Sequence, residues 1–141
     1  HFAEKLGFSI IDASKTDTVK EIQKITNGKG ADVVFDTAGT SKTAGQLLFL
    51  VRPKGKITVV GLYKQPAGVD LFNMIIKEAS LSGSRVYTDV DFEKAAQLVI
   101  SEKLNVASLI SHRLSLEETE KGIKLVEEGK DVMKAVVLPQ G

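Results

Sequence analysis

Short runs of apolar and β-branched residues alternate along the chain with segments whose apolar residues recur at helical spacing. The runs Asp32–Asp36 and Lys56–Val60 carry consecutive apolar residues, which predicts strands that are buried on both faces. Between them, Ala44, Leu47 and Leu48 share one face of a predicted helix. This alternation predicts an α/β fold with a doubly wound, mostly parallel sheet.

Local signals predict the remaining elements. Thr18 and Glu21 form a capping box that opens a helix, and Ser115 and Glu118 form another. The other predicted strands are Ser9–Asp12, the extended segment Ala79–Tyr87 and Lys134–Leu138, while Leu109–Leu114 is ambiguous. The other predicted helices are Phe2–Leu6, Leu71–Lys77, and one capped by Asp91 with Phe92, Ala95, Ala96 and Val99 on its inner face.

The composition is typical of a single globular domain. The chain has 141 residues, of which 43% are hydrophobic and 26% are charged, enough to build an apolar core. The net charge of +1 provides no basic surface, so no nucleic-acid partner is expected. The longest apolar run, Leu47–Val51, has five residues, so no membrane helix is expected.

Cysteine is absent, which excludes disulfides, thiolate nucleophiles and zinc sites built on cysteine. The two histidines, His1 and His112, are too few for a histidine-rich metal site. His1 stands where a methionine is expected, which predicts a truncated or tag-derived start, and no secretory signal follows it. These features predict a cytoplasmic protein whose chain holds no metal.

A doubly wound dinucleotide site begins with a strand, a glycine-rich turn and a helix N-terminus that holds the pyrophosphate. No Gly-x-Gly-x-x-Gly occurs here, and Gly28-Lys29-Gly30 lies between a helix and a strand instead. The order of elements is therefore that of a doubly wound sheet without its first two strands. Ser9–Asp12 then has no neighbour and Asp32–Asp36 has an open edge, which predicts rearrangement, assembly through that edge, or completion by another segment.

Two segments of small residues follow predicted strands. Thr37-Ala38-Gly39 comes after Asp32–Asp36, and Val60-Gly61-Leu62 ends the next strand along the chain. Ligands of doubly wound sheets bind at the carboxyl ends of strands, where small residues let a ligand approach the backbone. Taken alone, each segment is more typical of an ordinary turn.

Three further positions carry polar chemistry with two interpretations each. Arg85 could bind a phosphate or carboxylate, and Lys134 could neutralise a phosphate, although isolated surface side chains are the more common interpretation. His112 has no carboxylate or nucleophile at a spacing typical of acid–base catalysis, which predicts a structural or surface role. Leu81–Tyr87 is a possible edge strand, which favours pairing between two chains.

Five segments, taken in order, carry a family resemblance. They are GADVVFDTAG, PKGKITVVGLY, EASLSGSRVY, LISHRLSLE and KAVVL. Each is weak by itself, but together they resemble the zinc-type medium-chain alcohol dehydrogenases from Phe2 to Pro139. Leu109–Glu117 resembles the polyol, butanediol and threonine dehydrogenase branch. The resemblance implies a Rossmann-type domain and hydride transfer between a secondary alcohol or polyol and NAD or NADP.

The resemblance also implies which residues contact the cofactor. The adenosine half would be bordered by Thr37, Ala38 and Gly39, and the nicotinamide ring by Val60, Gly61 and Leu62. The carboxamide would meet backbone groups of Ser84, Arg85 and Val86, and the pyrophosphate would lie near Lys134. A homodimer or tetramer through the edge near Leu81–Tyr87 is implied as well.

Several parts of the family pattern are not present in this chain. The resemblance places the zinc ligands, the proton relay and the glycine-rich turn upstream, which implies no catalytic or metal-binding residue among 1–141. We therefore expect a partial dinucleotide-binding domain that is inactive by itself. Two alternatives stay open: a self-associating module without a cofactor, and part of a zinc-independent quinone or enoyl reductase.

Overall fold

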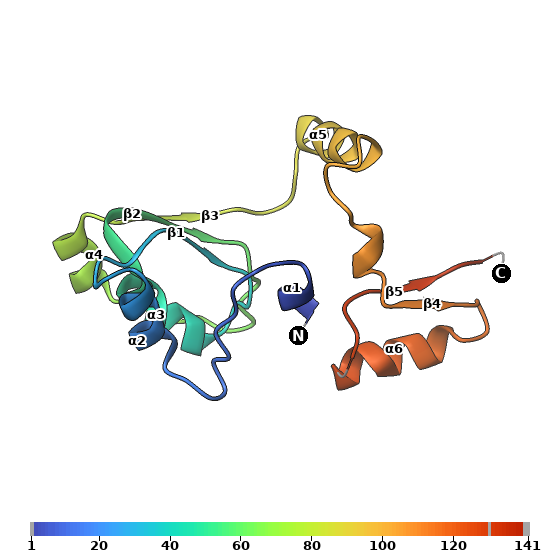
Figure 1. The fold of residues 1–141 in the computed structure, drawn as a ribbon, viewed down its shortest axis with the longest axis horizontal. Coiled ribbons are helices and arrows are strands. Elements are labelled where there is room, and N and C mark those ends of the chain that lie inside the picture. The colour runs from blue at the N-terminus through green and yellow to red at the C-terminus, as the bar shows by residue number, and fades with distance from the viewer. Residues whose placement is uncertain (1, 130, 140–141) are drawn as a thin grey trace. The chain divides into compact units, whose positions relative to one another are not determined.

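The computed structural model describes residues 2–129 and 131–139, so His1 and its predicted origin lie outside the described residues. Contacts divide the chain into two compact units, 1–86 and 87–141, here called the first and second unit. Figure 1 shows that helices and strands alternate along both. The predicted α/β class is confirmed.

A parallel sheet forms the centre of the first unit. Its described strands, in the order β1-β2-β3, are β1 (Ala31–Asp36), β2 (Val51–Val59) and β3 (Ser80–Gly83). The helices of this unit are α1 (Phe2–Lys5), α2 (Thr18–Ile25), α3 (Ser41–Leu50) and α4 (Leu71–Lys77). Helix α3 packs against β1 and β2, and α2 packs against α3 on the same side of the sheet (Figure 1).

The core lies between α3 and one face of this sheet. Leu47 and Leu48 of α3 are buried against Val51 and Ile57 of β2 and against Ala79. A capping box between Thr40 and Thr43 starts α3 and so orients these leucines toward the strands. Each fully buried leucine or isoleucine contributes about 1.5–3 kcal/mol.

The opposite face of β1 differs from its prediction. Consecutive apolar residues indicated burial on both faces, but the side chains of Val33 and Phe35 are 46% and 66% exposed. Successive side chains of a strand alternate between faces, so Val34 packs into the core while its neighbours face away from α3. Among the described elements of this unit, α3 and α4 are the helices that pack on β2, which leaves this face of β1 uncovered.

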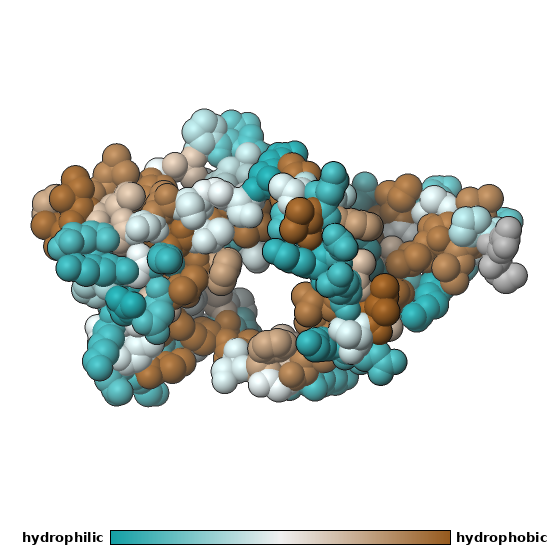
Figure 2. Space-filling view, turned by 90° about the horizontal axis from the view of Figure 1, so that it is seen from above, coloured by the Kyte–Doolittle hydropathy of each residue, from teal (hydrophilic) through white to brown (hydrophobic). Residues whose placement is uncertain are grey.

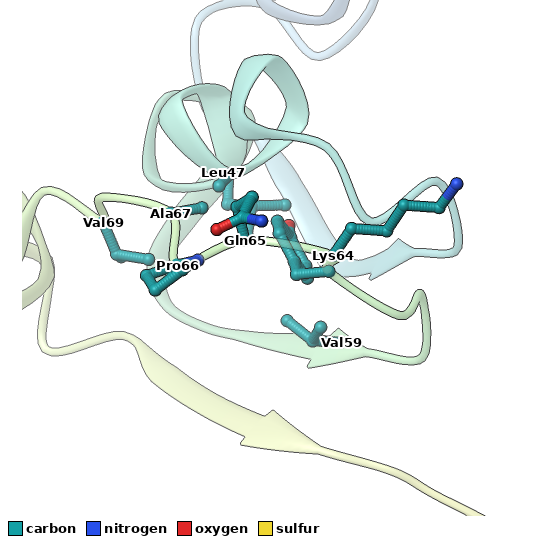
Figure 3. Close-up of a pocket in the computed structure, with 9 residues that line it drawn as sticks. Leu47, Val59, Lys64, Gln65, Pro66, Ala67 and Val69 are labelled. Atoms are coloured by element: carbon teal, nitrogen blue, oxygen red, sulfur yellow. The ribbon is translucent and has the colours of Figure 1, made fainter.

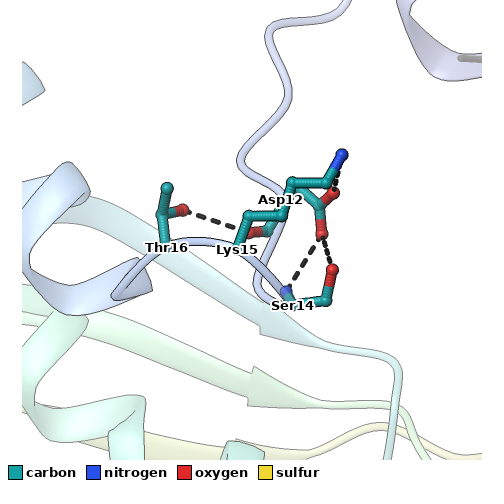
Figure 4. Close-up of polar contacts among 4 residues, drawn as sticks. All are labelled: Asp12, Ser14, Lys15 and Thr16. Atoms are coloured by element: carbon teal, nitrogen blue, oxygen red, sulfur yellow. Dashed lines mark hydrogen bonds and ion pairs between the residues drawn. The ribbon is translucent and has the colours of Figure 1, made fainter.

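Residues Ser9–Asp12, predicted to be a strand, form no strand in the structure. A lone strand cannot satisfy its backbone groups, and no neighbour for it exists among the described residues. The segment ends in a turn organised by Asp12 instead (Figure 4). The Asp12 carboxylate accepts hydrogen bonds from the Ser14 amide at 3.0 Å and the Ser14 hydroxyl at 2.6 Å, and it pairs with Lys15 at 3.1 Å.

The N-caps of three helices differ from their predicted positions. Asp17, not Thr18, caps α2, because its carboxylate accepts from the amides of Val19 and Lys20. In the second unit, Glu118 rather than Ser115 is the N-cap of α6 (Thr119–Glu128), and no side chain caps it.

Thr88 is the N-cap of α5 (Asp89–Ile100), and Asp91 completes its capping box. All three predictions recognised the polar cluster but not which residue leaves the helical conformation first.

The second unit contains a separate parallel pair of strands. Its elements are α5 (Asp89–Ile100), a short 3-10 helix η1 (Ala107–Leu109), β4 (His112–Leu114), α6 (Thr119–Glu128) and β5 (Ala135–Val137), with β4 paired to β5. Helix α6 packs on this pair. The predicted inner face of α5 is wrong: Phe92 and Val99 are 64% and 41% exposed, because the strands of this unit pack against α6.

The turn at Asp12 predicts a pH-dependent contribution to stability. Hydrogen bonds from Ser14, together with Lys15, lower the pKa of Asp12 from 3.8 to about 2. Because the folded pKa lies below the unfolded one, the stabilisation is present above about pH 4 and is lost as the pH falls toward 2. We expect Ser14→Ala to raise the Asp12 pKa toward 3.8 in a carboxyl NMR titration. Ser9→Ala, three residues before the turn, is the control and should leave that pKa unchanged.

Candidate functional site

Two of the predicted contact segments meet at the carboxyl ends of β1 and β2. Thr37–Gly39, here the first loop, follows β1, and Val60–Leu62, the second loop, follows β2. A Cβ atom at Gly61 would lie 2.4 Å from the Gly39 nitrogen, and one at Gly39 would lie 2.8 Å from the Leu62 oxygen. The backbones of the loops are therefore in direct contact, which only glycine permits at these positions.

Asp36, the last residue of β1, joins the two loops. Its main-chain oxygen accepts hydrogen bonds from the amides of Val60 at 2.8 Å and Gly61 at 2.9 Å. Its carboxylate accepts from the amides of Ala38 at 3.0 Å and Gly39 at 3.3 Å. One residue therefore holds the first loop by its side chain and the second loop by its backbone.

Two side chains complete the surroundings of the Asp36 carboxylate. The Thr43 hydroxyl of α3 donates to it at 3.2 Å, and the Tyr63 hydroxyl, which follows the second loop, donates a short hydrogen bond. Asp36 is only 4% exposed, so its charge depends on these donors. Burial alone raises the pKa of the Asp36 carboxyl, but the hydrogen bonds from Tyr63, the first loop and Thr43 outweigh it and hold the pKa below its usual value.

The same contact affects Tyr63. Burial raises the pKa of its phenol, and the hydrogen bond to the Asp36 carboxylate raises it further. The sequence predicted both loops but not the hydrogen-bonded pair of Asp36 and Tyr63. Asp36 ended a predicted strand and Tyr63 ended a predicted turn, and no local spacing connects residues so far apart in the sequence.

The third predicted segment, Ser84–Val86, follows β3 and is here the third loop. The Ser84 amide donates to the main-chain oxygen of Val59 at 2.8 Å, which places Ser84 beside the end of β2. Arg85 is exposed, and its guanidinium forms no hydrogen bond or ion pair with the residues that the structure describes. Val86 has φ 59°, a left-handed conformation that costs a β-branched residue about 1–3 kcal/mol.

Lys134, the tenth predicted contact, belongs to the second unit. Its side chain is exposed, and its main-chain oxygen accepts from the amides of Ser111 at 3.0 Å and His112 at 3.2 Å. The Ser111 hydroxyl lies 3.0 Å from His112 Nδ1 and also accepts from the Met133 amide at 3.0 Å. These contacts hold the residues before β5 against the start of β4, so Ser111 and the Lys134 backbone stabilise the strand pair.

An open pocket of about 380 Å³ lies beside the second loop, between α3, β2 and residues 63–69. Its lining is mainly apolar: Figure 3 shows Leu47 of α3 and Val59 of β2 with Pro66 and Val69 of the connecting segment. The ring of Tyr63 forms part of the wall. No sequence pattern predicted this pocket, because its walls come from three separate segments.

Zinc does not fit the residues present. In the described ranges 2–129 and 131–139, no group of three or more His, Cys, Asp and Glu side chains could hold a metal ion. The same part of the chain has no helix with the length and apolar character needed to cross a membrane.

The contact between the loops predicts that they tolerate no side chain at Gly61. Gly61→Ala places a Cβ atom 2.4 Å from the backbone of Gly39, and we expect it to destabilise the chain in urea unfolding by about 1–3 kcal/mol. Gly45→Ala is the matched control, because nothing lies within 4 Å of its added Cβ. In the interior of α3 it should stabilise by about 0.5–1 kcal/mol. Equal effects of the two substitutions would contradict the tight contact.

The chain matches a protein-family model and several curated proteins. A family model described as zinc-binding dehydrogenase matches residues 1–101. Sorbitol dehydrogenase of Halalkalibacterium halodurans is 34% identical over 97% of this chain and 40% of its own length. The chain thus spans about two fifths of the length of the curated relatives that it matches.

Solved structures of dehydrogenases also match this chain. The crystal structure of 2R,3R-butanediol dehydrogenase from Bacillus subtilis matches with a TM-score of 0.88 and 28% identity over 99% of this chain and 40% of that chain. A zinc-binding dehydrogenase from Sinorhizobium meliloti 1021, solved with bound NADP, matches with a TM-score of 0.80 and 25% identity over 92% of this chain and 38% of that one. The matching family model spans more than half of the chain, and this chain belongs to the zinc-binding dehydrogenases, the zinc-type medium-chain alcohol dehydrogenase family.

Proposed function

We propose that the chain is the cofactor-binding portion of an oxidoreductase that transfers hydride between a secondary alcohol or polyol and NAD or NADP. The observation that carries this proposal is the convergence of three loops at the carboxyl ends of three parallel strands. Ligands of doubly wound sheets bind at that edge. The NADP-bound relative and the sorbitol and butanediol dehydrogenase relatives support the cofactor and the substrate class.

The residues present suit one part of a dinucleotide. We assign the adenosine half to the first loop, the nicotinamide ring to the second loop and its carboxamide to the backbone of the third loop. Gly39 and Gly61 let the first and second loops contact each other through their backbones, which places the two proposed contact segments side by side at this edge. Lys134 is proposed to neutralise a pyrophosphate charge. The bound cofactor would supply the hydride chemistry.

The proposed role of the chain is binding rather than turnover. The described residues provide no group of side chains that could hold zinc, so we propose that the isolated chain is inactive. The assignment of 1–141 to a partial dinucleotide-binding domain and the cytoplasmic location, expected from the lack of cysteine, are parts of the same proposal.

Self-association is proposed through the free edge of β3, near Leu81–Tyr87. Among the described strands, β3 pairs with β2 alone. The Ser84 amide points to β2, so the alternating backbone directs the amides of Leu81 and Gly83 to the free edge. Helix α4 precedes β3 in the chain and packs on β2, and Figure 2 shows hydrophobic residues gathered where α4 lies. Leu71, Phe72, Ile75 and Ile76 are between 64% and 75% exposed.

Cofactor binding is tested by titrating the chain with NADH and NADPH and following the fluorescence of the reduced ring. We expect saturable binding, with Lys134→Ala raising the dissociation constant about 3- to 10-fold through loss of a charge near phosphate. Lys103→Ala, an exposed lysine of the same unit, is the control. A chain that binds neither cofactor at millimolar concentration would overturn the proposal and favour a self-associating module instead.

The edge is tested by sedimentation velocity. Gly83→Pro removes an outward amide from β3 and should shift the association equilibrium toward monomer by about tenfold. Gly83→Ala keeps the amide, and nothing lies within 4 Å of its added Cβ, so it should associate like the unchanged chain. Identical profiles for the two variants would argue against assembly through this edge.

A further inference from the structure

We infer that Tyr63 is a positioning residue: its hydrogen bond to Asp36 holds the second loop at the distance from the first loop that cofactor binding requires. This inference rests on the proposed function, because the two loops are the proposed contacts of the two cofactor halves. Tyr63 is not among the residues proposed to contact the cofactor. It acts through Asp36 and through the chain that it follows.

The hydrogen bond from Tyr63 completes the set of donors around the Asp36 carboxylate. Asp36 binds the first loop through two amides at 3.0 and 3.3 Å, and its main-chain oxygen binds the start of the second loop. Within the described residues 60–69, Tyr63 is the side chain that reaches the carboxylate itself. The Tyr63 phenol therefore ties the residue after the second loop to the same Asp36 carboxylate that binds the first loop.

Packing alone does not fix the phenol. Its ring lines the open pocket of about 380 Å³, so one side of the ring lacks close neighbours. A ring with free space beside it is held mainly by its polar contact. Without the hydroxyl, the ring could move into the pocket and take the residues after Leu62 with it.

Small movements matter here because the loops already touch. A Cβ atom at Gly61 would lie 2.8 Å from the Gly39 Cα and 2.9 Å from the Thr37 carbonyl carbon. Motion of the second loop therefore changes the shape of this edge directly. The first loop keeps its own bonds to Asp36, so loss of the Tyr63 hydroxyl should affect the nicotinamide end and spare the adenosine end.

The experiment compares Tyr63→Phe with Ser108→Ala, which removes a hydroxyl of the second unit that donates to the main-chain oxygen of Asn105 at 2.8 Å. Dissociation constants are measured for NADH and for ADP-ribose, which lacks the nicotinamide ring. We expect Tyr63→Phe to weaken NADH binding about 3- to 10-fold and to leave ADP-ribose binding unchanged. Ser108→Ala should change neither. Equal weakening of both ligands would indicate a general loss of structure and overturn the inference, as would unchanged NADH binding.

A second measurement needs no ligand. Hydrogen exchange of the Val60 and Gly61 amides, which donate to Asp36, should become at least about fivefold faster in Tyr63→Phe, while the core amide of Ile57 stays unchanged. Unchanged exchange of both loop amides would overturn the inference. If the chain without any substitution binds no cofactor, the proposed function fails. The hydrogen-exchange comparison still decides whether Tyr63 holds the second loop.

Discussion

The first unit depends on keeping one buried carboxylate hydrogen bonded. Asp36 is 4% exposed, and a buried charge without partners would be far too costly for a small unit to bear. Its donors come from the first loop, from α3 and from Tyr63. The path of the chain after β1 and after β2 therefore follows from one requirement. The same requirement brings together the two loops that we assign to cofactor binding.

The sequence predicted well whatever local pattern controls. Strand β1 and helices α3 and α4 lie close to their expected positions, because apolar spacing and turn residues define them. Strand β2 ends one residue before its predicted end but begins at Val51, five residues before the predicted Lys56. Predictions failed where the outcome depends on a partner element. Ser9–Asp12 has strand character but no neighbour, and Phe92 has helical spacing but no strand to cover it. Asp36 and Tyr63 pair only once two strands lie side by side, which no local pattern encodes.

The first unit exposes several large apolar side chains. Phe35 on the uncovered face of β1 is 66% exposed. The apolar residues of α4 named above are between 64% and 75% exposed. The free edge of β3 adds unpaired backbone groups to the same unit. The self-association proposed through β3 would bury part of this surface.

A site built from backbone contacts explains how the fold persists at modest sequence identity. The relatives with TM-scores of 0.88 and 0.80 are only 28% and 25% identical. What the loops require is a small residue where backbones touch, a hydrogen-bond acceptor at the end of β1 and parallel strands of matching register. These requirements constrain few side chains and leave most of the surface free to vary. In our proposal, the hydrogen bond between Tyr63 and Asp36 positions the second loop without itself contacting the cofactor.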